Sequence, residues 1–251
     1  MKYILTFFLC FGFLTSFSQS DTSRKKADTD TLLSKILYAL PREMHKQFIE
    51  DYNKMNATQR KEMLELIDAF ASMPRSSKKQ LIQNVDTNYS NIVALKSFFK
   101  TIVPINYSMY IEFKPPEKIL NLDESIDFWL YRKNQKNNKD EVIFQNWSIE
   151  LKSTKLDSLL SLTTLKRNDL QNLKKYLDKA NCISVSNKAN FEIGFARSGM
   201  GKYSYLIFDK PLSKEEQKKY NNGCEYIFYK TNIVLEYGGG AIGPQCFPDS
   251  E

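Results

Sequence analysis

The hydrophobic periodicity changes once along the chain, and this change divides the chain into two halves. Up to residue 103 the apolar side chains recur every three or four residues, as in Leu32, Ile36 and Leu40. This spacing places them on one stripe of an α-helix. After Pro104, β-branched and aromatic residues alternate with polar ones, which is typical of strands. We therefore predict a helical domain over residues 21–103 and a second domain over 104–251.

Five short amphipathic helices are predicted in the first half. Pro41 fits the first position of the second helix. Asn56, with Gln59 three residues later, predicts a capping box at the start of the third. A fourth helix restarts after Pro74, and Asp86 is the expected cap of the fifth. Short helices with tight connections predict a compact helical bundle.

The second half contains segments that read as strands and three that read as helices. The expected strands are 107–113, 126–131, 142–151, 183–185, 191–195, 203–208, 226–229 and 233–237. Helices are expected over 156–162 and 169–177, and Ser213 with Glu216 predicts a capping box for a third. Strands followed by helices and more strands indicate an α+β domain. The predicted fold class is α+β: an N-terminal helical bundle followed by a mainly antiparallel sheet domain with a few helices.

Residues 1–20 have the pattern of a secretory signal peptide. Lys2 gives a cationic start, the apolar run is Ile4 to Leu14, and small residues favour cleavage after Ser18 or Ser20. The apolar run is roughly half of the ~20 residues that cross a bilayer. We therefore expect a periplasmic or secreted protein that has no transmembrane segment once the signal peptide is removed.

Charge and residue types narrow the function classes. The chain has 36 Lys and Arg against 29 Asp and Glu, a net charge of +7, and the two signs are interspersed. Proteins that bind nucleic acid concentrate positive charge on one face, so we expect no nucleic-acid partner. His45 is the only histidine, which argues against Ser/His/Asp and Cys/His nucleophile systems. Paired CxxC spacing is absent, so we expect no metal site, and we expect no cofactor.

Three cysteines follow the signal peptide, namely Cys182, Cys224 and Cys246. A turn at residues 231–232 that pairs Tyr229 with Val234 brings Cys224 near Cys246. We therefore predict a Cys224–Cys246 disulfide with Cys182 buried and free. A Cys182–Cys246 disulfide is the alternative.

Two glycine-rich loops near the C-terminus hold the most unusual local chemistry. Residues 197–203 form either a hairpin with solvated charges or an anion-accepting loop. Residues 236–246 form either a flexible tail or an ordered loop. Ordering such loops costs backbone entropy without an obvious packing gain, and such places are often functional. The predicted ligand-binding residues are Arg197, Lys202, Tyr203, Glu236 and Gln245.

Residues 180–251 also carry a resemblance. The strings ANCIS at 180–184, SGMGKYSY at 198–205, LEYGGG at 235–240 and GPQCF at 243–247 resemble a C-terminal module of uncharacterised secreted proteins from Bacteroidota-type bacteria. The end of the signal peptide is similar to leaders of that group. This resemblance gives a context for the protein and implies no particular chemistry.

Three functions compete at this level. The first is a non-enzymatic binding protein for an envelope or extracellular protein or glycan, favoured by 14 tyrosines that offer contact area with a polar tip. The second is a hydrolase or transferase acting on envelope polymers, with Glu236 and Asp209 as its carboxylates. The third is an inhibitor or immunity-type protein. The sequence leaves open whether the protein is an enzyme.

Overall fold

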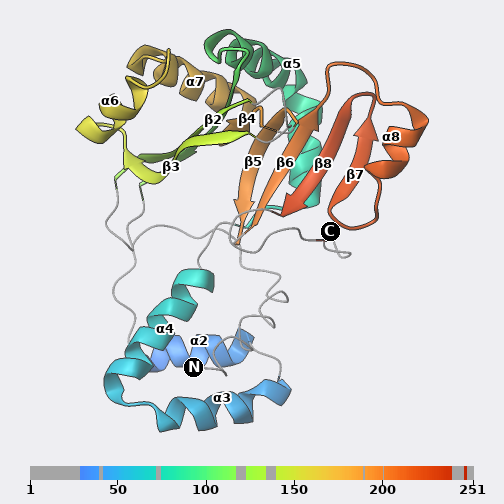
Figure 1. Cartoon of the computed structure of the whole chain (residues 1–251). Coiled ribbons are helices and arrows are strands. Elements are labelled where there is room, and N and C mark those ends of the chain that lie inside the picture. The colour runs from blue at the N-terminus through green and yellow to red at the C-terminus, as the bar shows by residue number, and fades with distance from the viewer. Residues whose placement is uncertain are drawn as a thin grey trace. The chain divides into compact units, whose positions relative to one another are not determined.

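The computed structural model divides the chain into two compact units, residues 1–73 and 74–251. It describes residues 29–39, 42–71, 75–116, 123–133, 140–188, 190–199, 201–238 and 246–247. Figure 1 labels the helices and strands of both units. The predicted signal peptide and Gln245 lie outside the described residues.

The described part of the first unit forms helices α2 (Thr29–Ala39), α3 (Arg42–Lys54) and α4 (Ala57–Ala71). Their apolar stripes meet in one buried cluster, composed of Leu32, Ile36, Phe48, Tyr52, Leu64 and Ile67. The capping box predicted before α4 is confirmed, because Asn56 and Gln59 exchange backbone-to-side-chain hydrogen bonds of 3.0 Å. The predicted five-helix bundle is not confirmed.

A single helix, α5 (Lys78–Ile102), replaces the fourth and fifth predicted helices. Ser77 caps its start, and Asn88 has non-helical backbone angles at a kink. Asp86 lies inside this helix and is not a cap. The apolar stripe of α5 is buried in the core of the second unit. The units therefore divide at residues 73/74, before the boundary expected at 103/104, since periodicity reveals the stripe but not what it packs against.

All eight predicted strands are present, and together they form one antiparallel sheet. Their bounds are β1 (Tyr107–Lys114), β2 (Ser125–Arg132), β3 (Glu141–Glu150), β4 (Ser184–Ser186), β5 (Glu192–Ser198), β6 (Gly201–Ile207), β7 (Tyr226–Lys230) and β8 (Ile233–Gly238). The strand order is β3-β2-β1-β4-β5-β6-β8-β7. The α+β class is thus confirmed for this unit.

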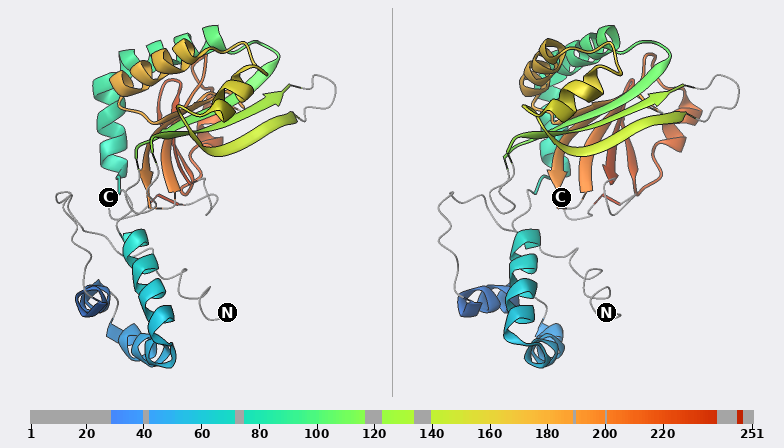
Figure 2. Two further views of the ribbon diagram at one scale, coloured as in Figure 1. Left: turned by 90° about the vertical axis from the view of Figure 1, so that its left-hand side faces the viewer. Right: turned by 60° about the vertical axis from the view of Figure 1, so that its left-hand side comes forward.

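Three further helices lie between strands of the sheet along the chain. They are α6 (Thr154–Leu160), α7 (Arg167–Ala180) and α8 (Lys214–Lys219). The predicted capping box of Ser213 and Glu216 opens α8. Helices α5 and α7 lie against one face of the sheet (Figure 2), where they share a core with inward-facing strand residues such as Ile111, Val185 and Leu235. Among the described residues, no helix has the length and apolar character needed to span a membrane.

The predicted disulfide joins Cys224 to Cys246, and Cys182 is free and buried. Next to the bond, the Phe247 backbone N–H donates to the Cys224 carbonyl at 2.9 Å, and the Phe247 ring is buried in the core. The pairing of Tyr229 with Val234 is wrong, because Phe228 occupies that position and the register shifts before Lys230. A pattern of alternation does not reveal such a bulge.

Breaking the disulfide should destabilise the second unit. The bond closes a loop with a sequence separation of 22, so Cys224→Ala should lower the free energy of unfolding by about 2 to 4 kcal/mol. Urea denaturation with and without reductant measures this. Cys182→Ala is the control and should keep the sensitivity to reductant. Equal stability of the parent with and without reductant would contradict the prediction.

Candidate functional site

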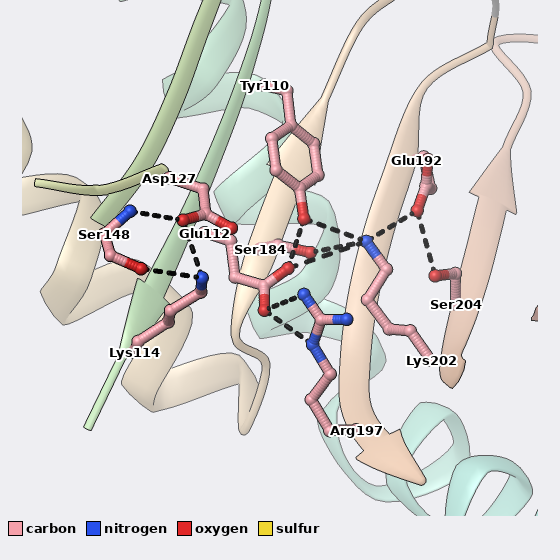
Figure 3. Close-up of polar contacts among 10 residues, drawn as sticks. All are labelled: Tyr110, Glu112, Lys114, Asp127, Ser148, Ser184, Glu192, Arg197, Lys202 and Ser204. Carbon is pink, nitrogen blue, oxygen red and sulfur yellow. Dashed lines mark hydrogen bonds and ion pairs between the residues drawn. The ribbon is translucent and has the colours of Figure 1, made fainter. Parts of the chain in front are cut away.

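The sheet face turned away from α5 and α7, here called the polar face, carries two adjacent groups of interacting charged and hydroxyl side chains (Figure 3). We call these two groups together the ionic network. It comprises Tyr110, Glu112, Lys114, Asp127, Ser148, Ser184, Glu192, Arg197, Lys202 and Ser204. The members come from strands β1 to β6. Several are buried, and the side chain of Glu112 is only 1% exposed.

Lys202 lies at the centre of the ionic network. Its Nζ is 3.0 Å from Glu192 Oε1 and donates to Ser184 Oγ at 3.1 Å. It also lies 4.0 Å from Glu112 Oε2. Burial opposes the charge of Lys202, but the nearby Glu192, Tyr110 and Glu112 outweigh burial and raise its pKa. A protonated lysine cannot accept a proton from Ser184, so this Ser/Lys contact is an anchor and not an activated nucleophile.

Arg197 and Tyr110 hold the buried carboxylate of Glu112. The guanidinium places Nη2 2.6 Å and Nε 2.7 Å from Glu112 Oε1. The Tyr110 hydroxyl donates to Oε2 of the same carboxylate. Burial opposes the charge of Arg197, but Glu112 outweighs it and raises the Arg197 pKa. Charge-assisted hydrogen bonds of this kind hold the two side chains in a defined orientation and also stabilise their opposite charges.

A β-bulge in β5 places Arg197 on the polar face. Glu192 and Gly194 pair with Leu206 and Ser204, and the register then shifts so that Arg197 pairs with Lys202. In a regular strand, residues five positions apart point to opposite faces. The bulge reverses this relation, so Glu192 and Arg197 both join the network.

Gly194 leaves room for the Lys202 side chain to cross β5. A Cβ at this position would lie 2.1 Å from Ser184 Oγ and 2.9 Å from Lys202 Cδ. Neither separation is possible without movement of a buried group. Gly194 therefore lets an ammonium from β6 reach Ser184 on β4 and Tyr110 on β1.

A second part of the network joins β1, β2 and β3. Lys114 Nζ lies 2.7 Å from Asp127 Oδ1. The backbone N–H of Ser148 donates to the same oxygen at 2.8 Å. Ser148 has a φ of 51°, and the β2–β3 register shifts opposite it, between the partners of Ile126 and Phe128. This bulge turns a strand N–H toward a buried carboxylate.

Glu236 is a half-buried carboxylate on the polar face. It pairs with Ser204 across β6 and β8, and its Oε1 accepts from the Tyr226 hydroxyl at 3.2 Å. Burial, with the nearby charge of Glu192, raises the pKa of Glu236 to about 7. The pKa of Glu192 is lowered instead, because Lys202 and Ser204 outweigh its burial. The two carboxyl groups therefore favour opposite protonation states.

Three of the predicted site residues lie on the polar face, namely Arg197, Lys202 and Glu236. Tyr203 lies on the other face, where it is buried and stacks on Tyr237 with 4.4 Å between ring centroids. Its position next to Lys202 in a regular strand requires this. Gln245 is outside the described residues.

The sequence interpretation missed Tyr110, Glu112, Ser184 and Glu192. A signal for the first two exists, because polar Tyr110, Glu112 and Lys114 alternate with apolar residues along β1. The sequence gives no signal that Glu112 meets Arg197, which lies 85 residues further on.

Asp209 lies away from Glu236. Its Oδ1 is 2.8 Å from Lys96 Nζ and 2.7 Å from Lys100 Nζ, both on α5, and these hydrogen bonds lower the pKa of Asp209 to about 2. Glu236 faces the polar side of the sheet opposite Ser204, whereas Asp209 lies beyond the end of β6 and holds lysines of α5, the helix that covers the other face.

His45 lies on α3, in the other unit. Among the described residues, no group of three or more His, Cys, Asp or Glu side chains could hold a metal ion. No family model, no curated protein and no solved structure matches this chain. The resemblance of residues 180–251 to secreted bacterial proteins therefore stays a prediction.

Replacing Gly194 should destabilise the second unit through the ionic network. Gly194→Ala forces Ser184 or Lys202 to move, and we expect a loss of about 1 to 3 kcal/mol in the free energy of unfolding. Adding Ser184→Ala removes the closer of the two clashes. The double variant should then lose less than the sum of the single variants in urea denaturation. Strict additivity would show that the clash with Ser184 is not the cause.

Glu236 should make stability depend on pH. Its folded pKa of about 7 lies above the ordinary value of 4.5, so its contribution is fully present below about pH 4.5 and is lost as the pH rises toward 7. Glu236→Gln cannot titrate. Its stability relative to the parent should rise by about 1 to 3 kcal/mol between about pH 5 and about pH 8.

Urea denaturation at both pH values measures this change. Glu215→Gln, at an exposed position on α8, is the control and should keep the parent's pH dependence. The same pH dependence in the parent and in Glu236→Gln would contradict the assignment.

Proposed function

We propose that this chain is a non-enzymatic binding protein that acts in the periplasm or outside the cell and recognises an envelope or extracellular protein or glycan through its polar face. The compartment is supported by the signal-peptide pattern of residues 1–20 and by the Cys224–Cys246 disulfide, which is compatible with an oxidising environment. The resemblance of residues 180–251 to secreted bacterial proteins points the same way.

One observation carries the binding role: two partly exposed cations on the polar face are each anchored to a buried carboxylate. The Arg197 side chain is 31% exposed and holds Glu112, while Lys114 is 32% exposed and holds Asp127, which is 4% exposed. Anchored side chains lose little further freedom when a ligand binds, so such a surface is organised before binding.

The roles of Arg197 and Glu236 are tested with variants that keep the fold. Arg197→Lys keeps the charge that Glu112 requires but loses the two-pronged contact, and Glu236→Ala removes a carboxylate without leaving a charge unpaired. We expect both to weaken binding to an immobilised envelope fraction from the producing cell by about tenfold or more. Thermal unfolding monitors the fold.

Arg167→Lys is the matched control. Arg167 begins α7 and pairs with Asp157 at 2.6 Å, so it is also an arginine held by a carboxylate, away from the polar face. Its binding should equal that of the parent. If Arg197→Lys and Glu236→Ala stay folded and bind as tightly as the parent, the site lies elsewhere, and the N-terminal unit becomes the better candidate.

The divergent protonation of Glu192 and Glu236 favours a second candidate function, an envelope-polymer hydrolase or transferase that uses Glu236. A carboxyl that stays protonated near neutrality beside one that stays ionised is the pattern of an acid and its partner. Their strands are separated only by β6, along which their partners are two residues apart, so their backbones lie roughly 12 Å apart. Release of new reducing ends from envelope glycan, lost in Glu236→Gln, would establish this function.

An inhibitor or immunity-type role would use the same face. Capture of a single secreted toxin by the parent, lost in Arg197→Lys, would identify it. Recovery of glycan fragments would instead favour the polymer functions.

A further inference from the structure

Three aromatic side chains from neighbouring strands form a continuous row on the polar face. Tyr110 on β1 stacks on Trp129 on β2 with 4.4 Å between ring centroids. Trp129 meets Trp147 on β3 at 5.6 Å, edge to face. We call these residues the aromatic row. Its outer member, Trp147, is 57% exposed on a strand at the edge of the sheet.

An exposed tryptophan at the end of an ordered row differs from a solitary surface residue. Tryptophan buries more apolar area per side chain than most residues and is enriched where proteins bind partners. The inner rings hold the row in place, because Tyr110 and Trp129 pack on each other and the Tyr110 hydroxyl donates to Glu112. The row is therefore a rigid, partly open aromatic surface.

Polar groups border this surface. Trp147 precedes Ser148, an exposed residue whose Oγ accepts from Lys114 Nζ at 3.4 Å. The other end of the row is closed, because Tyr110 and the Lys202 ammonium 4.9 Å from its ring centroid are both buried. A ligand on Trp147 and Trp129 would thus have aromatic contacts beneath it and the Ser148 hydroxyl and Lys114 ammonium at its edge.

The charges beside the row balance. The ionic network contains three cations, Lys114, Arg197 and Lys202, and three carboxylates, Glu112, Asp127 and Glu192, so their formal sum is zero. These groups are paired with one another within 4.0 Å. Charged groups that already pair with one another offer no unpaired charge to a polyanion or a polycation, which favours an uncharged ligand.

Trp129 supplies a further observation. Its Nε1 is buried and meets no hydrogen-bond acceptor among the described residues. Buried donors are nearly always paired in native proteins, and an exception calls for an explanation. An acceptor brought to the row by a ligand would provide one.

We propose that the aromatic row binds an uncharged saccharide chain. A pyranose ring has C–H faces that pack on aromatic rings and hydroxyl edges that exchange hydrogen bonds with polar side chains. The aromatic row and its polar borders offer both features in that arrangement. This inference builds on the proposed binding function and specifies its ligand class.

The chain provides a selective probe of this site, because its two tryptophans are Trp129 and Trp147. Intrinsic tryptophan fluorescence of the full chain therefore reports on the aromatic row alone. We would titrate the protein with cellohexaose, with chitohexaose and with neutral glycan fragments released from the producing cell's envelope. A saturable change in emission with at least one of them, at concentrations up to roughly 10 mM, is expected.

Variants locate the binding. Trp147→Ala changes an exposed side chain, so the fold should persist while affinity, measured by calorimetry, falls by about tenfold or more. Trp147→Phe keeps an aromatic ring and should retain most of the affinity. Tyr89→Ala removes an exposed aromatic residue from α5 and is the control, with affinity equal to the parent's.

Two results would overturn the proposal: no saturable change with any of the three saccharides, or equal affinity in the parent and a folded Trp147→Ala. Recovery of a protein partner that requires Arg197, together with no response to saccharides, would overturn this inference while leaving the proposed binding function in place. Loss of saccharide binding in Trp147→Ala, with binding kept in Trp147→Phe and Tyr89→Ala, would support the proposal.

Discussion

The side chain of Lys202 reaches across β4, the shortest strand of the sheet, and the arrangement of the polar face depends on this lysine. Strand β4 has three residues and forms three register pairs on each side. Only these few pairs join β1 to β3 with β5 to β8. Lys202 reaches from β6 to Tyr110 on β1. Buried ion pairs add little net stability, but leaving one partner unpaired is costly. The network therefore fixes how the two parts of the sheet meet.

This fixed geometry connects the two regions of functional interest. The aromatic row contacts the ionic network through Tyr110, and Glu192 links that network through Ser204 to the strand that pairs with Glu236. A ligand lying along the polar face could thus contact aromatic rings at one end and carboxyl groups at the other. Binding and catalysis differ here in whether Glu236 only contacts the ligand or transfers its proton, because both need the same organised surface.

Local patterns predicted much of this fold from the sequence. Alternation located all eight strands, and capping residues located the starts of α4 and α8, because both signals arise from residues close together in the chain. The packing of α5 against the sheet was not predictable, because an apolar stripe shows that a helix is buried but not which element it packs against. The glycines beside Arg197 and Lys202 drew attention to these two residues, which lie on the polar face, but Glu112 was missed. Tyr203, predicted together with them, lies on the other face.

The bulge at Ser148 also affects how the sheet meets other chains. Strand β3 is one edge of the sheet, and an edge strand with a regular ladder can pair with a strand of another molecule. At Ser148 the strand turns its N–H inward to Asp127 and takes a positive φ, which interrupts the outward ladder. The opposite edge, β7, is five residues long and follows the disulfide-bonded Cys224. The bulge thus shortens the regular ladder that β3 offers to a strand of another molecule.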